Sequence, residues 1–82
     1  MTRFLALLRG INVGGNNLIK MNDLKAEFER LGFQDVKTYI QSGNVIFSSA
    51  LSDKLKLTEL LEKSLSEKFS YPARVLLEQL PS

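Results

Sequence analysis

The chain has 82 residues, enough for one small domain with a single hydrophobic core. Its 11 basic and 9 acidic residues are interspersed and give a net charge of +2, so it lacks the concentrated basic stripe of a dedicated nucleic-acid-binding protein. The absence of cysteine and histidine excludes disulfides, thiol catalysis, zinc sites and histidine acid–base chemistry within these residues. The apolar run Phe4–Leu8 is too short to span a membrane and has no signal-peptide cleavage pattern, so we expect a cytoplasmic protein that contacts no membrane.

The first part of the chain predicts a strand, a loop and a helix. Thr2–Arg9 has a continuous apolar run, which favours a strand that is buried on both faces. Gly10–Lys20 is rich in glycine and asparagine and predicts a loop. In Met21–Leu31 apolar residues recur at steps of three and four, which predicts a helix. Asn22 or a residue just before it is expected to cap this helix, and Gly32 to end it in a left-handed conformation.

The middle of the chain predicts a β-hairpin. Apolar and polar residues alternate in Gln34–Gln41, which is typical of a strand. The sequence Ser42-Gly43-Asn44 is typical of a tight turn, and Asn44–Ser48 resumes the strand pattern.

The last part predicts a second helix and a final strand. We expect the helix at Asp53–Ser70, with Ser52 as its N-cap and a favourable ion pair between Glu59 and Lys63. Ala73–Gln79 predicts the last strand. The apolar stripe of the helix consists of Leu57, Leu60, Leu61, Leu65 and Phe69.

The order strand–helix–strand–strand–helix–strand predicts a ferredoxin-like α+β fold, with a four-stranded antiparallel sheet and both helices on one face. In this topology the first and second strands run parallel, with the third antiparallel between them. The end of the first strand at Arg9 therefore lies at the same edge of the sheet as the hairpin turn Ser42–Asn44.

Two loops rich in glycine and asparagine thus meet beside an arginine. Glycines let a ligand approach backbone N–H groups closely, a loop leading into a helix favours anions, and an arginine can bind phosphate or carboxylate. The sequence matches neither of the glycine fingerprints of nucleotide-binding loops. The alternative interpretation is that these residues only form turns. The candidate residues for a small anionic or polar ligand are Arg9, Gly10, Asn12, Gly14, Gly15, Asn16, Asn17, Gln41, Ser42, Gly43 and Asn44.

Catalysis has little support in the two loops. They contain no aspartate or glutamate for acid–base chemistry, and Ser42 has only Lys20 as a nearby candidate base. We therefore name no catalytic residue, no metal and no cofactor, and we expect this chain alone not to be an enzyme.

The sheet face that the helices leave open is a second candidate for function. Leu5 and Leu7 alternate with Phe4, Ala6 and Leu8, so one of these two sets is expected to lie on the open face, and Tyr39 can join it. Contiguous apolar surface usually marks an interface. We expect Leu5, Leu7 and Tyr39 to contact a missing C-terminal domain or a second copy of the chain.

Several stretches resemble one bacterial family, catalogued as domain of unknown function 1697. They are LLRGINVGGNN at 7–17, the following Lys20-Met21, LGF at 31–33 and TYIQSGNVIF at 38–47. The resemblance implies a ferredoxin-like fold for residues 1–82 as one domain, the N-terminal portion of a longer chain. It implies no established activity and assigns no role to any residue.

Three functions remain open at this point. The first is a binding module for a small ligand at the two loops. The second is a structural domain that associates through its open sheet face. The third is single-stranded RNA binding, with Phe4 and Phe47 of the two central strands as the stacking aromatics, although the basic-glycine-aromatic signature of RNA-recognition folds is absent.

Overall fold

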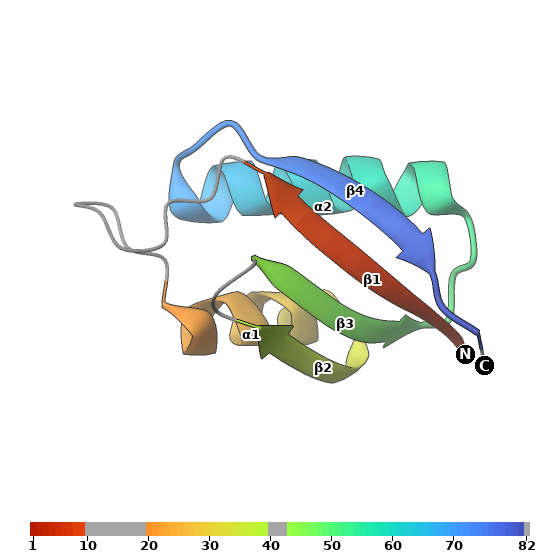
Figure 1. Cartoon of the computed structure of the whole chain (residues 1–82). Coiled ribbons are helices and arrows are strands. Elements are labelled where there is room, and N and C mark those ends of the chain that lie inside the picture. Colours follow the sequence, from red (N-terminus) through yellow and green to blue (C-terminus); the bar gives the residue numbers. More distant parts are fainter. Residues whose placement is uncertain (10–19, 40–42, 82) are drawn as a thin grey trace.

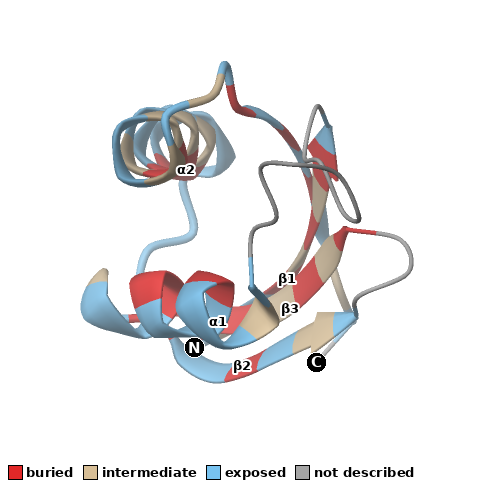
Figure 2. Ribbon diagram, turned by 90° about the vertical axis from the view of Figure 1, so that its left-hand side faces the viewer, coloured by how far each residue is buried: buried red, intermediate tan, exposed pale blue. Residues whose placement is uncertain are grey.

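The computed structural model describes residues 1–9, 20–39 and 43–81. The sheet has the strand order β2-β3-β1-β4, and every neighbouring pair is antiparallel. Both helices cover one face of this sheet, so the molecule has two layers (Figures 1 and 2). The predicted ferredoxin-like fold is thereby confirmed. Its elements are β1 (Thr2–Arg9), α1 (Met21–Arg30), β2 (Gln34–Tyr39), β3 (Asn44–Ser49), α2 (Lys54–Phe69) and β4 (Arg74–Gln79).

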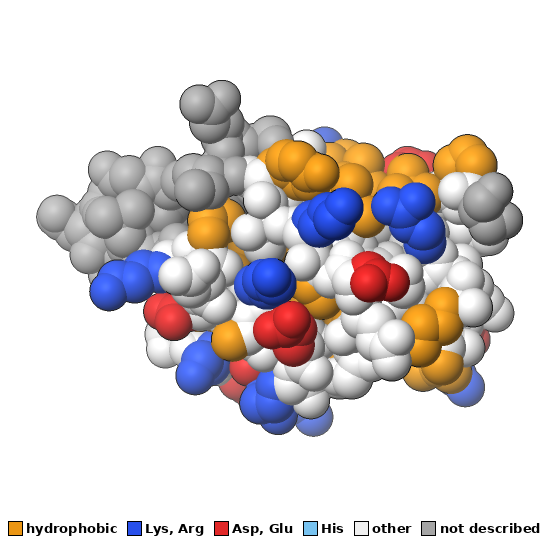
Figure 3. Space-filling model, turned by 90° about the horizontal axis from the view of Figure 1, so that it is seen from below, with side chains coloured by type: hydrophobic (Ala, Val, Ile, Leu, Met, Phe, Trp, Pro, Cys, Tyr) orange, Lys and Arg blue, Asp and Glu red, His pale blue; other side chains and the backbone are white. Residues whose placement is uncertain are grey.

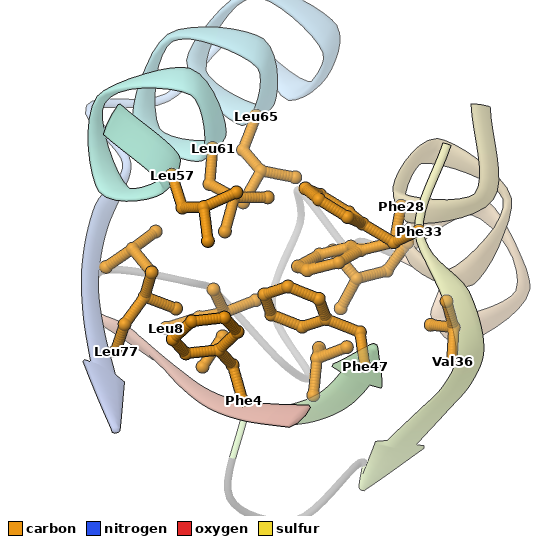
Figure 4. Packing of buried hydrophobic residues seen from close by; sticks show 14 of the residues in the cluster. Phe4, Leu8, Phe28, Phe33, Val36, Phe47, Leu57, Leu61, Leu65 and Leu77 are labelled. Atoms are coloured by element: carbon orange, nitrogen blue, oxygen red, sulfur yellow. The ribbon is translucent and has the colours of Figure 1, made fainter. Parts of the chain in front are cut away.

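The core lies between the sheet and the helices and is centred on Phe47 of β3. The ring of Phe47 lies 5.7 Å from Phe4, 5.4 Å from Phe28 and 4.6 Å from Phe33, measured between ring centroids. From α2, three leucines of the predicted stripe point toward these rings (Figure 4). Aromatic pairs at such separations add specific packing to the burial of apolar area. The leucines are Leu57, Leu61 and Leu65.

Strand β1 alternates between the two faces of the sheet. Phe4, Ala6 and Leu8 are buried under the helices, whereas Leu5 and Leu7 are only half-buried and belong to the opposite face. The prediction that β1 is buried on both faces is therefore wrong. A sheet with helices on one side buries only alternate residues of each strand.

Helix α2 begins one residue later than predicted, because its N-cap is Asp53 and not Ser52. One carboxylate oxygen of Asp53 accepts hydrogen bonds from the backbone N–H groups of Leu55 and Lys56. Two further expectations for this helix are wrong. Leu60 is 38% exposed and lies outside the buried stripe, and Glu59 and Lys63 form no ion pair in the described part of the chain.

Helix α1 begins at Met21, and its N-cap is Lys20, which makes no side-chain capping bond. Asn22 therefore lies inside the helix and is not its cap. At the other end Gly32 has φ of 96°, a left-handed conformation that a side chain rarely adopts, as its position predicted.

Strand β2 is an edge strand with a β-bulge. Gln34 is opposite Ser48 and Lys37 is opposite Ile46, so β2 has one residue more than β3 between these pairs. Asp35, within this segment, has φ of 52°. The last two residues of the predicted strand Gln34–Gln41 lie outside the described residues.

Candidate functional site

The edge where β1 ends brings together the described members of the predicted site. The backbone N–H of Leu8 donates to the carbonyl of Gly43 at 3.0 Å, and Leu7 is opposite Asn44. Gly43 is buried and has φ of 65°, which favours glycine at this position. The end of β1 and the start of β3 therefore lie side by side, as the topology predicted.

Three of the predicted ligand residues are described by the structure. Arg9 is exposed at the end of β1, Asn44 is half-buried at the start of β3, and Gly43 precedes it. The predicted residues outside the described part of the chain are Gly10, Asn12, Gly14, Gly15, Asn16, Asn17, Gln41 and Ser42.

A second arginine, Arg74 at the start of β4, lies directly opposite Arg9 in the antiparallel pairing of β1 with β4. Both side chains are exposed. Like charges that face one another across two strands destabilise a sheet. Sequence reasoning missed Arg74, and only the register of the last strand against the first could have found it.

The start of β4 is fixed to α2 by two side-chain bonds. The N–H of Ala73 donates to Ser66 Oγ at 2.9 Å, and the N–H of Val75 donates to Glu62 Oε2 at 2.9 Å. Arg74, which lies between these two anchored residues, donates from Nη1 to the carbonyl of Ala73 at 3.2 Å. The backbone that carries the second arginine is therefore held in place by the helix behind it.

No carboxylate neutralises this pair of arginines among the described residues. The ion pair found there joins Glu27 to Arg30, both of helix α1. Lys20 is exposed at the start of α1, which begins at the same end of the molecule (Figure 1). The N-terminus of a helix carries a partial positive charge, so this end of the molecule favours anions.

Tyr71 lies in the connection between α2 and β4. Its hydroxyl oxygen is buried and has no hydrogen-bond partner among the described residues. Burial raises the pKa of Tyr71, because the phenolate would lose its hydration. The phenol therefore stays neutral near neutral pH.

A buried carboxylate joins the two helices, on the side of the sheet that the helices cover. Glu27 of α1 is 3% exposed and accepts hydrogen bonds from Arg30 Nε at 2.9 Å and from Ser64 Oγ of α2 at 2.6 Å. Hydrogen bonding from Arg30 lowers the pKa of Glu27 to about 2; Ser64 adds to this effect and burial opposes it. A carboxylate held ionised in this way is a poor general base, so we interpret the cluster as a structural link.

This link lies beside a shallow groove of about 260 Å³, lined by Glu27, Arg30, Ser64, Glu67 and Lys68. The sequence carries a signal for the link between the helices. Glu27 is three residues after Leu24 and four before Leu31, and so it lies on the apolar face of α1.

The RNA hypothesis loses its stacking residues in this fold. Phe4 and Phe47 are fully buried beneath the helices and do not face the open side of the sheet. Of the predicted interface residues, Tyr39 is 48% exposed, and Leu5 and Leu7 are half-buried.

No helix among the described residues is long and apolar enough to cross a membrane. No group of three or more acidic side chains in residues 1–9, 20–39 and 43–81 is placed to hold a metal ion.

Strand order, helix placement and the cationic edge define a ferredoxin-like α+β domain with paired arginines where its first strand ends. The chain matches the family described as "Protein of unknown function (DUF1697)" over residues 1–81, and it belongs to that family.

A solved structure of a conserved bacterial protein from Streptococcus pneumoniae is 38% identical to this chain, with a TM-score of 0.80. The match covers 95% of this chain and 43% of the pneumococcal chain, so this chain spans less than half the length of that relative. No curated protein matches the chain significantly.

Proposed function

We propose that this domain is a binding module for a small anionic or polar ligand, held between the Arg9–Asn17 loop and the Gln41–Asn44 turn. The observation that carries the proposal is the pair Arg9 and Arg74, which lie opposite each other with no neutralising carboxylate among the described residues. An oxyanion bound between the two guanidinium groups would offset their mutual repulsion, because each group attracts the negative charge.

The neighbouring groups support the same chemistry. Asn44 is half-buried beside Leu7 and offers an amide that can donate to an oxyanion or to a neutral polar group. The anchoring of β4 to α2 means that Arg74 loses little backbone freedom when it binds. Among the described residues at this edge, Arg9, Gly43, Asn44 and Arg74, no side chain suits acid–base chemistry, so the activity proposed is binding.

The test is a titration with inorganic phosphate at low ionic strength, followed by amide NMR and by calorimetry. We expect saturable shifts at Gly43 and Asn44, and a loss of affinity of about ten-fold or more in Arg9→Ala and in Arg74→Ala. Lys25→Ala is the matched control, because Lys25 is an exposed cation on α1. Binding should weaken with added salt.

Two results would count against the proposal. Shifts that rise linearly with phosphate and never saturate would show that the edge has no site. Equal affinity in Arg9→Ala and Lys25→Ala would show that phosphate binds elsewhere or by net charge alone.

The second candidate is a structural role, in which the loops only fix the fold and the open sheet face mediates association. The observation in its favour is the apolar surface of that face, which includes Leu76 at 44% exposure and Tyr39 at 48%. Loss of phosphate binding would leave this candidate standing, because it makes no use of the arginines as ligand residues.

A further inference from the structure

The open face of the sheet has apolar residues at its centre. On this face Leu7 lies opposite Leu76 of β4, and Leu5 lies opposite Ile46 of β3. Tyr39 of β2 lies in the same row as Leu7, with the polar Asn44 between them. We call these residues the apolar centre of the open face: Leu5, Leu7, Tyr39, Ile46 and Leu76. An isolated domain would leave all five in contact with water, which is the usual mark of an interface.

Basic side chains border this centre. In each strand they occupy positions that alternate with core residues, and they therefore belong to the open face. Figure 3 shows hydrophobic side chains along the upper margin of that view with Lys or Arg side chains directly beneath them. The border holds four basic residues, which are Arg3, Arg9, Lys37 and Arg74. It holds one acidic residue, Glu78, when only residues with a regular partner in the neighbouring strand are counted; Asp35 lies in the bulge of β2 and has none.

This charge pattern argues against a second copy as the occupant. Two open faces placed together would bring eight basic side chains against two acidic ones around an apolar contact. Like charges placed opposite one another at an interface disfavour association, so the face is not complementary to itself.

We propose that the open face is the docking surface for a partner with an apolar centre and carboxylates at its border. In longer proteins of the family, this partner is the part of the same chain that lies outside the region matched here. The pneumococcal relative supports this choice of partner, because the match covers 43% of its chain and the larger part of that chain lies outside the match. The docking surface shares Arg9 and Arg74 with the anion site. Its apolar centre includes no predicted ligand residue, so labelling of that centre can fail or succeed whatever the phosphate titration shows.

Hydroxyl-radical labelling with mass spectrometry tests the proposal directly. It should be applied to this 82-residue chain and to the full-length pneumococcal protein at the equivalent positions. We expect labelling of the apolar centre in this chain and a several-fold loss of labelling in the longer protein. The position equivalent to Leu55, which is 77% exposed on α2, is the control and should label equally in both.

Sedimentation of this chain over a range of concentrations supplies the second readout. We expect a monomer, because the border charges oppose self-association. A dimer that Leu7→Glu dissociates and Leu55→Glu leaves intact would overturn the proposal in favour of a second copy. Equal labelling of the apolar centre in the short chain and the full-length protein would overturn it as well.

Discussion

Replacing Glu27 by glutamine tests the link between the two helices. Glutamine keeps the size of the side chain and one oxygen that can accept the hydrogen bond from Ser64 Oγ, which the carboxylate accepts at 2.6 Å. It removes the negative charge that faces Arg30. The substitution therefore separates the contribution of the negative charge from that of the side chain's size and its hydrogen bond with Ser64.

The expected loss follows from the pKa of Glu27. Its value of about 2, against an ordinary value of 4.5, corresponds to about 3 kcal/mol of preference for the ionised form in the folded state. The side chain of Arg30 is 65% exposed, so solvent screens the pair and the full value is an upper limit. We expect Glu27→Gln to lower the free energy of unfolding by about 1–2 kcal/mol near neutral pH.

The pH dependence has a definite sign. The pKa of Glu27 is lower in the folded state than in the unfolded state, so its contribution is fully present above pH 4.5 and is lost as the pH falls toward about 2. Wild-type protein should lose stability in this interval. The glutamine variant should lose less, because it has no carboxylate to protonate at this position.

Urea denaturation followed by far-UV circular dichroism, from about pH 7 down to about pH 3, measures both effects. Glu59→Gln is the control, because it removes an exposed carboxylate from α2. The reasoning would be refuted if Glu27→Gln matched the control near neutral pH. It would also be refuted if wild type and Glu27→Gln lost stability in parallel as the pH fell.

Three further substitutions test local features of the fold. Gly32→Ala should lower the free energy of unfolding by about 1–2 kcal/mol, because φ is 96° there and a side chain is strained in that conformation. No atom lies within 4 Å of the added Cβ, so a loss well above this range would contradict a purely conformational cause. Asp53→Ala should cost about 1 kcal/mol in urea denaturation and Ser52→Ala almost nothing, and the reverse order would show that the cap is misassigned. Tyr71→Phe should leave the thermal midpoint unchanged or raise it, because the buried hydroxyl has no partner among the described residues; a clear drop would reveal one.

The sequence allowed the topology to be predicted because the hydrophobic periods are clear. Steps of three and four residues identified the helices, and alternation identified β2 and β3. The continuous apolar run of β1 hid its alternation, since Leu5 and Leu7 are as apolar as their buried neighbours. Burial on one face or two depends on what covers the sheet, which no single strand encodes.

The details that the sequence did not reveal depend on geometry across elements. Ser52 and Asp53 are both good cap residues, and only the position of the first helical turn decides between them. Topology alone placed Arg9 beside Gly43, because the turn and the strand end share an edge. The placement of Arg74 required the register of β4 on β1, which side chains distant in sequence determine together.

The bulge in β2 affects whether another chain can add a strand to this edge of the sheet. An exposed edge strand is a template on which another chain can add a strand, and unchecked addition of that kind leads to aggregates. Here the edge is six residues long, and its extra residue puts the outer N–H and C=O groups out of line for a straight neighbour. Growth of the sheet past β2 is therefore discouraged, and β4 is the edge that keeps a regular ladder with its neighbour.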